Sequence, residues 1–427
     1  MLIAFIAVFV LFLWGVPIFA AFGLSSALAL WLVFDMPPHM VAQVLYARAD
    51  SYVLLAMPMF ILAGNLLVHG GGVKYAVNLF DSWLGHVPGG LMVVVITGCA
   101  FFAAISGSGL AAILTLGVML FPEMEKHGYE RHIASAVIVI AAILGPIIPP
   151  STVMIILGSL MEVSTGALFA CGMIPGLTIA AGLIIVGIAL AKWKKYPLRP
   201  AASWKERWTS LYKSIPFLTL PIAILGGIYS GYFTPTEAAT VAATLSLIIG
   251  IVYRGMSFGK IWTSLKGAAA SAANIMVLMC GIEVFSKFLH LTGVPTMLTQ
   301  AIMAAEMSGF VFVCISAAIV FALGFLFPPW ATMFMLMPLL MPILLALGVN
   351  YYWFATIYCI NVTAAGCTPP FAYSIFVGSR VLGVSFEDIV KGELWFLPVH
   401  YIVMIAIILF PPLALWLPTV MGMRVGL

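Results

Sequence analysis

The sequence predicts an all-α protein that crosses a membrane many times and is built from two related halves. The chain has 427 residues, of which 64% are hydrophobic and 7% are charged, and its mean hydropathy is +1.19. A soluble protein could not cover its surface with so few charges, so most of this surface must face lipid. A pattern of prolines and glycines in the first half also recurs in the second half. Two copies of an interrupted helical unit are typical of transporters built around a central site.

The recurring pattern centres on two pairs of adjacent prolines. Pro149 and Pro369 are 369 − 149 = 220 residues apart, and so are their neighbours Pro150 and Pro370. The same separation relates three further sites to their counterparts, namely Pro122 to Pro342, Gly128 to Gly348 and Gly158–Ser159 to Gly378–Ser379. Because prolines and glycines dictate backbone shape, the pattern predicts two copies of the same broken helix.

Long apolar runs supply the predicted membrane helices. They are Met1–Phe34, Leu91–Phe121, Ile133–Ala191 and Tyr401–Met421. Each matches or exceeds the roughly 20 residues that cross a bilayer, and we expect about twelve membrane segments in all. The first run lacks the basic start of a signal peptide, so it predicts mature protein with a hinge at 15–17.

The composition argues against several other kinds of protein. The six cysteines stand singly in apolar stretches, as buried hydrophobic residues do, rather than in metal or redox motifs. The sequence contains no GxxxxGK[ST], HExxH or GxSxG motif for ATP hydrolysis or intramembrane hydrolysis. The net charge of +4 is small and scattered, which does not favour nucleic-acid binding.

One strongly basic stretch separates residues 1–191 from residues 214–427. Residues 192–213 contain seven basic residues, one acidic residue and three tryptophans: Lys192, Lys194, Lys195, Arg199, Lys205, Arg207 and Lys213 with Glu206, Trp193, Trp204 and Trp208. Such a segment is typical of a loop on the cytoplasmic membrane face. We therefore expect a cytoplasmic linker between two halves. If the halves are inverted, each must cross the membrane an odd number of times.

A less apolar, amphipathic segment precedes each copy of the repeat. The first contains Lys74, Asp81, Trp83 and His86, and the second contains Glu283, Lys287 and His290. Both are expected to lie along the membrane interface as arm helices. Glu283 and Lys287 are four residues apart, which favours an ion pair on one helix face, with proton coupling as the alternative.

The first candidate site lies in residues 104–109 and 145–151. Three prolines within five positions, Pro146, Pro149 and Pro150, interrupt the helix and free backbone carbonyls that must line protein or a wet cavity. Nearby hydroxyls come from Ser106, Ser108, Ser151 and Thr152. Neutral oxygens suit a monovalent cation such as Na⁺, and helix N-termini suit an anion. A simple kink with locally bonded hydroxyls is the alternative.

The second candidate site repeats these features in residues 322–332 and 361–370. Gly366, Thr368 and the twin prolines again combine a break with oxygen atoms, and Asn361 and Thr363 precede the break by one to two turns. Neither copy has a carboxylate at its tip, which argues against a proton relay. Arg380 is positioned to touch an anion, with an interfacial snorkelling role as the alternative.

These phrases resemble the large membrane subunit of tripartite ATP-independent periplasmic (TRAP) transporters. The matching stretches, in family order, are Phe60–Asn65, Phe101–Ser108, Gly145–Ser151, Ile174–Gly176, Phe233–Ala238 and Thr368–Pro370. The resemblance implies an elevator-type fold with two inverted repeats, two re-entrant helical hairpins and two broken helices. It also implies Na⁺-coupled uptake of an organic acid, with no cofactor. The implied partners are a periplasmic substrate-binding protein and a small four-helix membrane subunit.

Carried over position by position, the resemblance implies two Na⁺ sites and a substrate site. The first Na⁺ site would contain Ser106, Gly107, Ser108, Gly145 and Pro146. The second would contain Gly324, Thr332, Gly366 and Thr368. The candidates for substrate contact are Ser106, Ser108, Asn361, Thr363 and Thr368, together with Arg380.

Two departures from the family pattern leave the second cation site and the substrate open. Many members carry an aspartate shortly after the Ser-Gly-Ser phrase and another before the proline of the second hairpin. Here those stretches read Gly109–Ala112 and Phe327–Trp330. A sulfonate or a bulky carboxylate is therefore an alternative substrate.

We predict a multi-pass protein of the bacterial inner membrane, in contact with lipid and not with nucleic acid. A single-component anion carrier of related fold is the nearest alternative. A channel or an intramembrane enzyme is the alternative from another class. A channel should offer polar rings along continuous helices and an enzyme a nucleophile with a base, so the paired breaks favour a carrier.

Overall fold

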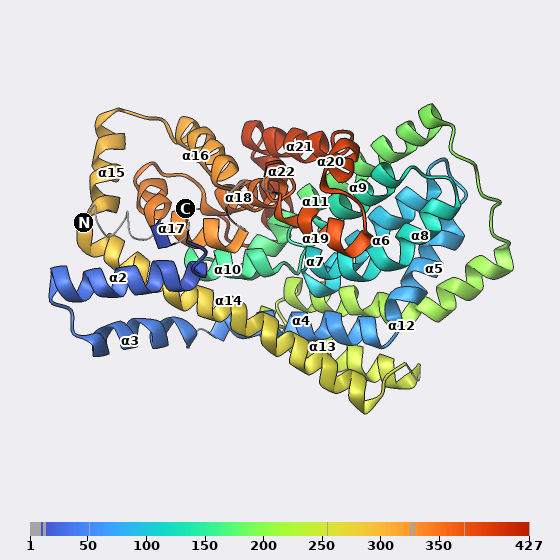
Figure 1. Cartoon of the computed structure of the whole chain (residues 1–427), viewed down its shortest axis with the longest axis horizontal. Helices are drawn as coiled ribbons and strands as arrows, with labels where there is room; N and C mark the ends of the chain where they lie inside the picture. Colours follow the sequence, from blue (N-terminus) through green and yellow to red (C-terminus); the bar gives the residue numbers. More distant parts are fainter. Residues whose placement is uncertain are drawn as a thin grey trace.

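The computed structural model describes residues 10–11, 14–50, 52–253, 255–324, 327, 329–370 and 372–426 (Figure 1). Within these residues every regular element is a helix and none is a strand, which confirms the all-α prediction. The first half contains α2 (Ile18–Phe34), α3 (Pro38–Ala49), the 3-10 turn η1 (Tyr52–Leu55), α4 (Ala56–His69), α5 (Gly72–Leu84), α6 (Gly90–Ser106), α7 (Gly109–Ala112), the π-helical turn η2 (Ile113–Gly117), α8 (Val118–Lys126), α9 (Arg131–Ala142), α10 (Thr152–Leu160) and α11 (Thr165–Lys194).

The second half follows with eleven further helices in the described residues. They are α12 (Trp204–Tyr229), α13 (Pro235–Val252), α14 (Phe258–Thr292), α15 (Val294–Ala304), α16 (Gly309–Gly324), α17 (Pro329–Ala346), α18 (Tyr351–Ala365), α19 (Tyr373–Leu382), α20 (Phe386–Glu393), α21 (Leu397–Leu409) and α22 (Pro412–Val420).

The repeat in the sequence is also a repeat of helix boundaries. At the separation of 220 residues, α8 and α17 end at Lys126 and Ala346, and α9 and α18 begin at Arg131 and Tyr351. The glycine in the connecting turn has φ of +79° at Gly128 and +64° at Gly348, a region that disfavours other residues. The peptide bonds Pro149–Pro150 and Pro369–Pro370 are both cis.

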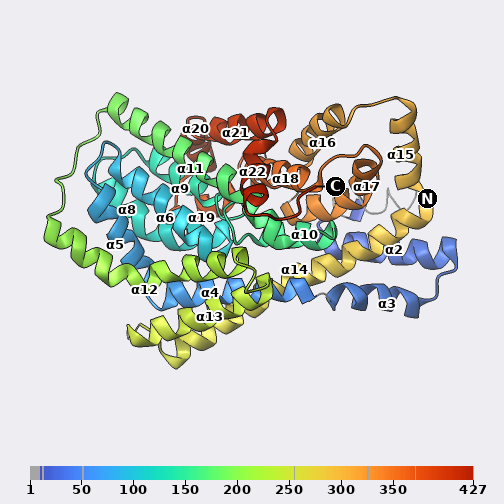
Figure 2. The ribbon, with the colours of Figure 1, turned by 180° about the vertical axis from the view of Figure 1, so that it is seen from behind.

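The long helix α14 runs along one side of the molecule with α2, α3, α4 and α13 (Figures 1 and 2). Glycines allow a close crossing in this layer: a Cβ on Gly281 of α14 would lie 2.4 Å from the carbonyl oxygen of Phe19. The segments that form the predicted hairpins and breaks, α6 to α10 and α16 to α19, lie beside this layer (Figure 1). The layer therefore provides a continuous wall next to both breaks.

Breaks divide the apolar runs into more pieces than their length suggests. Six described helices are long and apolar enough to cross a membrane, or seven if α20 and α21, bent by 50°, count as one span. Five further apolar helices have only 10–17 residues. For example, the run Leu91–Phe121 contains α6, α7, η2 and the start of α8.

The amphipathic segments differ from the prediction in the second half. The first is the separate helix α5, which follows Gly70 and Gly71. Residues 283–290, however, form the end of the continuous helix α14. The counterpart of α5 is instead α15, which begins after Gly293 with φ of +71°. A separate second arm helix therefore starts about ten residues later than the charges suggested.

The predicted linker is partly helical. Its irregular part spans 195–203, and α12 begins at Trp204 because Ser203 and Glu206 form a capping box. Lys194, at the end of α11, donates to both carboxylate oxygens of Glu130 at 3.0 and 3.1 Å. Burial and the neighbouring Glu130 charge raise the pKa of Tyr196 to about 12, so its phenol stays neutral at physiological pH.

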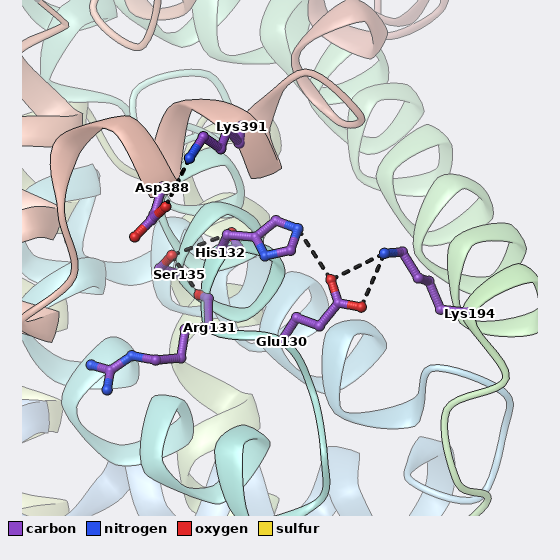
Figure 3. A network of polar contacts seen from close by, with 7 residues as sticks. All are labelled: Glu130, Arg131, His132, Ser135, Lys194, Asp388 and Lys391. Carbon is purple, nitrogen blue, oxygen red and sulfur yellow. Dashed lines mark hydrogen bonds and ion pairs between the residues drawn. The ribbon is translucent and has the colours of Figure 1, made fainter.

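The start of the first broken helix is held by a polar network (Figure 3). Glu130, the residue before α9, lies 3.2 Å from Nε2 of His132 and joins it to Lys194. The hydroxyl of Ser135 donates to the carbonyl of Arg131 at 2.7 Å. Asp388 and Lys391 form an ion pair on α20, which packs against α9. The ion pair of Glu130 with Lys194 ties the start of α9, the end away from its break, to α11.

Candidate functional site

The first hairpin turns at Gly107 and Ser108. Helix α6 ends at Ser106, whose hydroxyl donates to the carbonyl of Phe102 at 3.0 Å. Gly107 then takes φ of +60°, and Ser108 caps α7 by accepting the amide of Ala111 at 3.4 Å. The glycine permits a turn that a side chain would strain, and the serine starts the next helix. The tip therefore places two hydroxyls beside the backbone of the turn.

The first break lies directly against this tip. Helix α9 ends at Ala142 and α10 begins at Thr152, with the hydroxyl of Ser151 donating to the carbonyl of Pro146. A Cβ on Gly107 would lie 2.4 Å from the carbonyl oxygen of Pro150. A Cβ on Gly145 would lie 2.6 Å from the amide nitrogen of Gly109. Hairpin and break thus meet through glycine backbones, with no side chain between them.

Several carbonyls of the first break accept no amide from the described residues. The carbonyl of Leu144 accepts the amides of Ile147 and Ile148. No amide among the described residues donates to the carbonyls of Ile143 and Gly145. In an apolar surrounding such carbonyls need a polar partner. Neutral oxygens of this kind fit a monovalent cation better than a transition metal.

The second break has the same plan, with a glycine contact as close as that of the first. Helix α16 ends at Gly324, where a Cβ would lie 2.4 Å from Cβ of Ala365 on α18. After Gly366, the hydroxyl of Thr368 donates to the carbonyl of Ala364 at 2.9 Å and lies 2.7 Å from the hydroxyl of Tyr401. Thr332 is fully buried near the start of α17. Phe325, Leu326 and Pro328 of the predicted second unit lie outside the described residues.

The first hairpin and the first break meet the start of α17 and parts of α18 and α19 at a small cavity of about 70 Å³. The first unit contributes Gly107, Ser108, Gly109, Pro146 and Thr152, and the second contributes Pro329, Trp330, Thr363, Tyr373 and Ser374. The hydroxyl of Thr152 also donates to the carbonyl of Gly107 at 3.0 Å. The volume has room for a small cation with a few waters.

A larger cavity of about 490 Å³ opens between this meeting point and the helices α4 and α14. It shares Ser108, Leu110, Thr152, Trp330 and Tyr373 with the small cavity. Its remaining lining residues are Ile61, Gly64, Asn65, Ser106, Ala111, Leu114, Ser271, Asn274, Ile275 and Leu278. No charged side chain of the described residues lines either cavity.

The structure brings together only part of the residues chosen from the sequence. Ser106, Gly107, Ser108, Gly145 and Pro146 are gathered at the first tip and break. Among the residues predicted around the second break, only the substrate candidate Thr363 lines the small cavity. Its hydroxyl donates to the carbonyl of Cys359 at 2.8 Å. Gly324, Thr332, Gly366 and Thr368 line neither cavity.

Two candidate substrate contacts lie away from both cavities. Asn361 is fully buried and donates to the carbonyl of Ala317 at 2.6 Å, so it joins α18 to α16. Arg380 is exposed in the last turn of α19 and lines neither cavity. In this conformation neither side chain faces the space that a substrate could fill.

Sequence reasoning missed the wall that α4 and α14 provide. Asn65 was part of a matching phrase without an assigned role, and Ser271 and Asn274 carried no motif. The available signal was the spacing of polar residues on α14. Ser271 lies seven residues after Ser264, and Asn274 three residues after Ser271, which places all three on one face of an apolar helix. Trp330 and Tyr373 also enter the site.

Comparison with known families decides the class of this protein. The family model of the DctM component of tripartite ATP-independent periplasmic transporters matches residues 5–413. The chain belongs to this family. The C4-dicarboxylate TRAP transporter large permease protein DctM of Vibrio cholerae is 32% identical over 98% of this chain and 97% of that protein. The 2,3-diketo-L-gulonate TRAP transporter large permease protein YiaN of Escherichia coli is 33% identical over 93% of this chain and 94% of that protein.

Another DctM relative is a longer protein. The isethionate TRAP transporter permease protein DctMQ of Oleidesulfovibrio alaskensis is 33% identical over 88% of this chain. The matched region spans 60% of the length of that protein. Because such relatives are named as transporter permease proteins, this DctM-family chain is a multi-pass membrane permease subunit and not an enzyme.

A solved structure supports the fold of this DctM-family chain. The crystal structure of the YdaH transporter of Alcanivorax borkumensis, described as having an unusual topology, superposes with a TM-score of 0.63 at 16% sequence identity. The match covers 90% of this chain and 91% of YdaH. At this identity the likeness concerns the fold alone.

Proposed function

We propose that this chain carries an organic anion across the bacterial inner membrane together with Na⁺, receiving the anion from a periplasmic binding protein. The observation that supports this most directly is the small cavity where the first hairpin tip and the first break meet α17, α18 and α19, with the hydroxyls of Ser108, Thr152 and Thr363 in its lining. A larger cavity opens beside it. A cation in the small cavity would supply the positive charge that the described lining residues lack, and would thereby attract an anion.

The first Na⁺ site is proposed at the first tip and break. Its oxygens would come from Ser106, Gly107, Ser108, Gly145 and Pro146, in a break where the carbonyls of Ile143 and Gly145 accept no amide from the described residues. The second Na⁺ site is proposed at the equivalent place in the second half, with Gly324, Thr332, Gly366 and Thr368. Among the substrate candidates, Ser106 and Ser108 line the larger cavity and Thr363 the smaller one. Thr368, Asn361 and Arg380 would need a different conformation to reach an anion.

Transport is proposed to proceed by an elevator movement of two inverted halves. The moving part would comprise the hairpins and broken helices, α6 to α10 and α16 to α19. The wall formed by α2, α3, α4, α13 and α14 would stay in place. Because the larger cavity lies between these two groups of helices, sliding one past the other would carry a bound anion with the tips.

Two partners are proposed in addition to the lipid bilayer. A small four-helix membrane subunit and a periplasmic binding protein are implied by the DctM family. A single-component carrier of the same fold is the alternative, and it would need neither partner.

Reconstitution tests the proposal and its alternative. The chain, purified and placed in liposomes alone, should show little uptake of radiolabelled organic acids. Adding the small subunit, the binding protein and an inward Na⁺ gradient should restore uptake, whereas a K⁺ gradient should not. Robust uptake by the chain alone would favour the single-component carrier, and uptake that ignores Na⁺ would refute the coupling.

A further inference from the structure

A polar face of α14 forms one side of the larger cavity. The hydroxyl of Ser264 lies 2.9 Å from Nδ1 of His69, and the amide of Asn65 donates to the carbonyl of Ser264 at 3.3 Å. A Cβ on Gly267 would lie 3.2 Å from Nδ2 of Asn65. These contacts hold α4 against α14 and fix the amide of Asn65 at the cavity edge.

Ser271 and Asn274 continue this face and have no partner of their own. Neither side chain makes a hydrogen bond within the described residues. Hydroxyls earlier on the same helix do bond within it: Ser264 donates to the carbonyl of Lys260 at 2.9 Å and Thr263 to that of Gly259 at 2.9 Å. An amide on a membrane-crossing helix is costly unless a polar partner reaches it. Both groups line the cavity, so a partner can reach them there.

The two sides of the cavity carry complementary features. On the tip side, Ser106 and Ser108 offer hydroxyls, and on the α4–α14 side, Asn65, Ser271 and Asn274 offer amides and a hydroxyl. Most of the remaining lining is apolar: Ile61, Leu110, Leu114, Ile275, Leu278 and the ring of Trp330. A ligand that satisfies this lining has one polar end and an apolar body. A ligand with charges or hydroxyls at both ends would leave polar groups against the apolar lining.

We propose that Asn65, Ser271 and Asn274 are the fixed half of the substrate site, and that the site selects an organic acid with one charged end and an apolar body. This rests on the proposed function, and it deepens that proposal by naming the substrate class. The amides donate to the anion opposite the hydroxyls of Ser106 and Ser108. Trp330 and the leucines contact the apolar body.

The test uses the chain with its small subunit in lipid nanodiscs and measures thermal unfolding against acid concentration. The probe is 3-phenylpropionate, with succinate and gluconate as acids that are polar at both ends. We expect 3-phenylpropionate to raise the unfolding temperature saturably in Na⁺ buffer, and the other two acids to act more weakly. Asn274→Leu should raise its half-saturating concentration about tenfold or more, the usual effect of losing a bond to a charged group.

Asn78→Leu is the matched control, because Asn78 lies on α5 and lines neither of the two cavities. Equal curves for Asn274→Leu and Asn78→Leu would overturn the role of the amide. Equal or stronger stabilisation by succinate or gluconate, or none by 3-phenylpropionate, would overturn the substrate class. Na⁺-driven uptake of radiolabelled organic acids by the wild-type complex with both partners is measured in parallel. If that uptake is present while the binding results contradict the inference, only the inference fails. If that uptake is absent, the proposed function fails as well.

Discussion

Thr152 donates its hydroxyl to the carbonyl oxygen of Gly107 across 3.0 Å and so joins the first break to the first hairpin tip. Both residues line the small cavity. The bond orients a carbonyl that is proposed to bind Na⁺. Loss of the bond should therefore lower the affinity for Na⁺ rather than the stability of the fold. Thr152→Val should therefore raise the half-saturating Na⁺ concentration of uptake about fivefold to tenfold, the effect of one hydrogen bond of about 1 kcal/mol. Thr152→Ser keeps the hydroxyl and should behave as wild type; an unchanged Na⁺ curve for the valine variant would contradict the role of this bond.

The contact of Gly145 with Gly109 predicts a strict size limit. A Cβ at position 145 would lie 2.6 Å from the amide nitrogen of Gly109 and 2.8 Å from the carbonyl carbon of Ser108, so backbone must move. Gly145→Ala should abolish Na⁺-dependent uptake while the protein still reaches the membrane. Gly226→Ala is the control: no atom lies within 4 Å of its Cβ, and alanine favours the helix α12. Normal uptake by Gly145→Ala would show that tip and break are loosely packed.

The linker predicts the orientation of the chain. Ala201 is exposed in the irregular segment 195–203, between basic residues expected on the cytoplasmic side. The cysteine added by Ala201→Cys should resist a membrane-impermeant maleimide in intact cells and react with it in inverted vesicles. The parent chain controls for its own six cysteines, of which four are buried. Labelling from outside the cell would reverse the orientation.

Glu393 predicts an unusual effect on stability. The side chain is 1% exposed, and neither carboxylate oxygen has a hydrogen-bond partner in the described part of the chain. Burying an unpaired polar group of this kind costs about 1–3 kcal/mol. Glu393→Met should therefore leave the unfolding temperature unchanged or raise it, whereas Glu393→Lys should lower it. A clear loss of stability in Glu393→Met, measured in the same detergent, would mean that the carboxyl has a partner.

The sequence could predict the parts of the fold that local chemistry determines. The twin prolines predicted the positions of both breaks. Ser108 and Ser151, which were chosen for their hydroxyls beside the first break, cap α7 and α10. Contacts between distant segments were not predictable, because no local pattern encodes them. Asn65 meets Ser264 across 199 residues, and only the folded chain brings α4 and α14 to one cavity. Arg380 is close to Pro369 in sequence but lines neither described cavity in this conformation.

The Na⁺ dependence of initial uptake by Ser108→Ala tests the central claim most directly. Ser108 caps α7, lines both cavities and belongs to the proposed first Na⁺ site. With matched protein amounts in proteoliposomes, the half-saturating Na⁺ concentration should rise about tenfold to a hundredfold, as expected for a lost bond to a charged group of about 1.5–3 kcal/mol. Ser82→Ala, on α5 away from both cavities, should keep the wild-type curve. A wild-type Na⁺ curve for Ser108→Ala would contradict a cation site where the first hairpin and the first break meet.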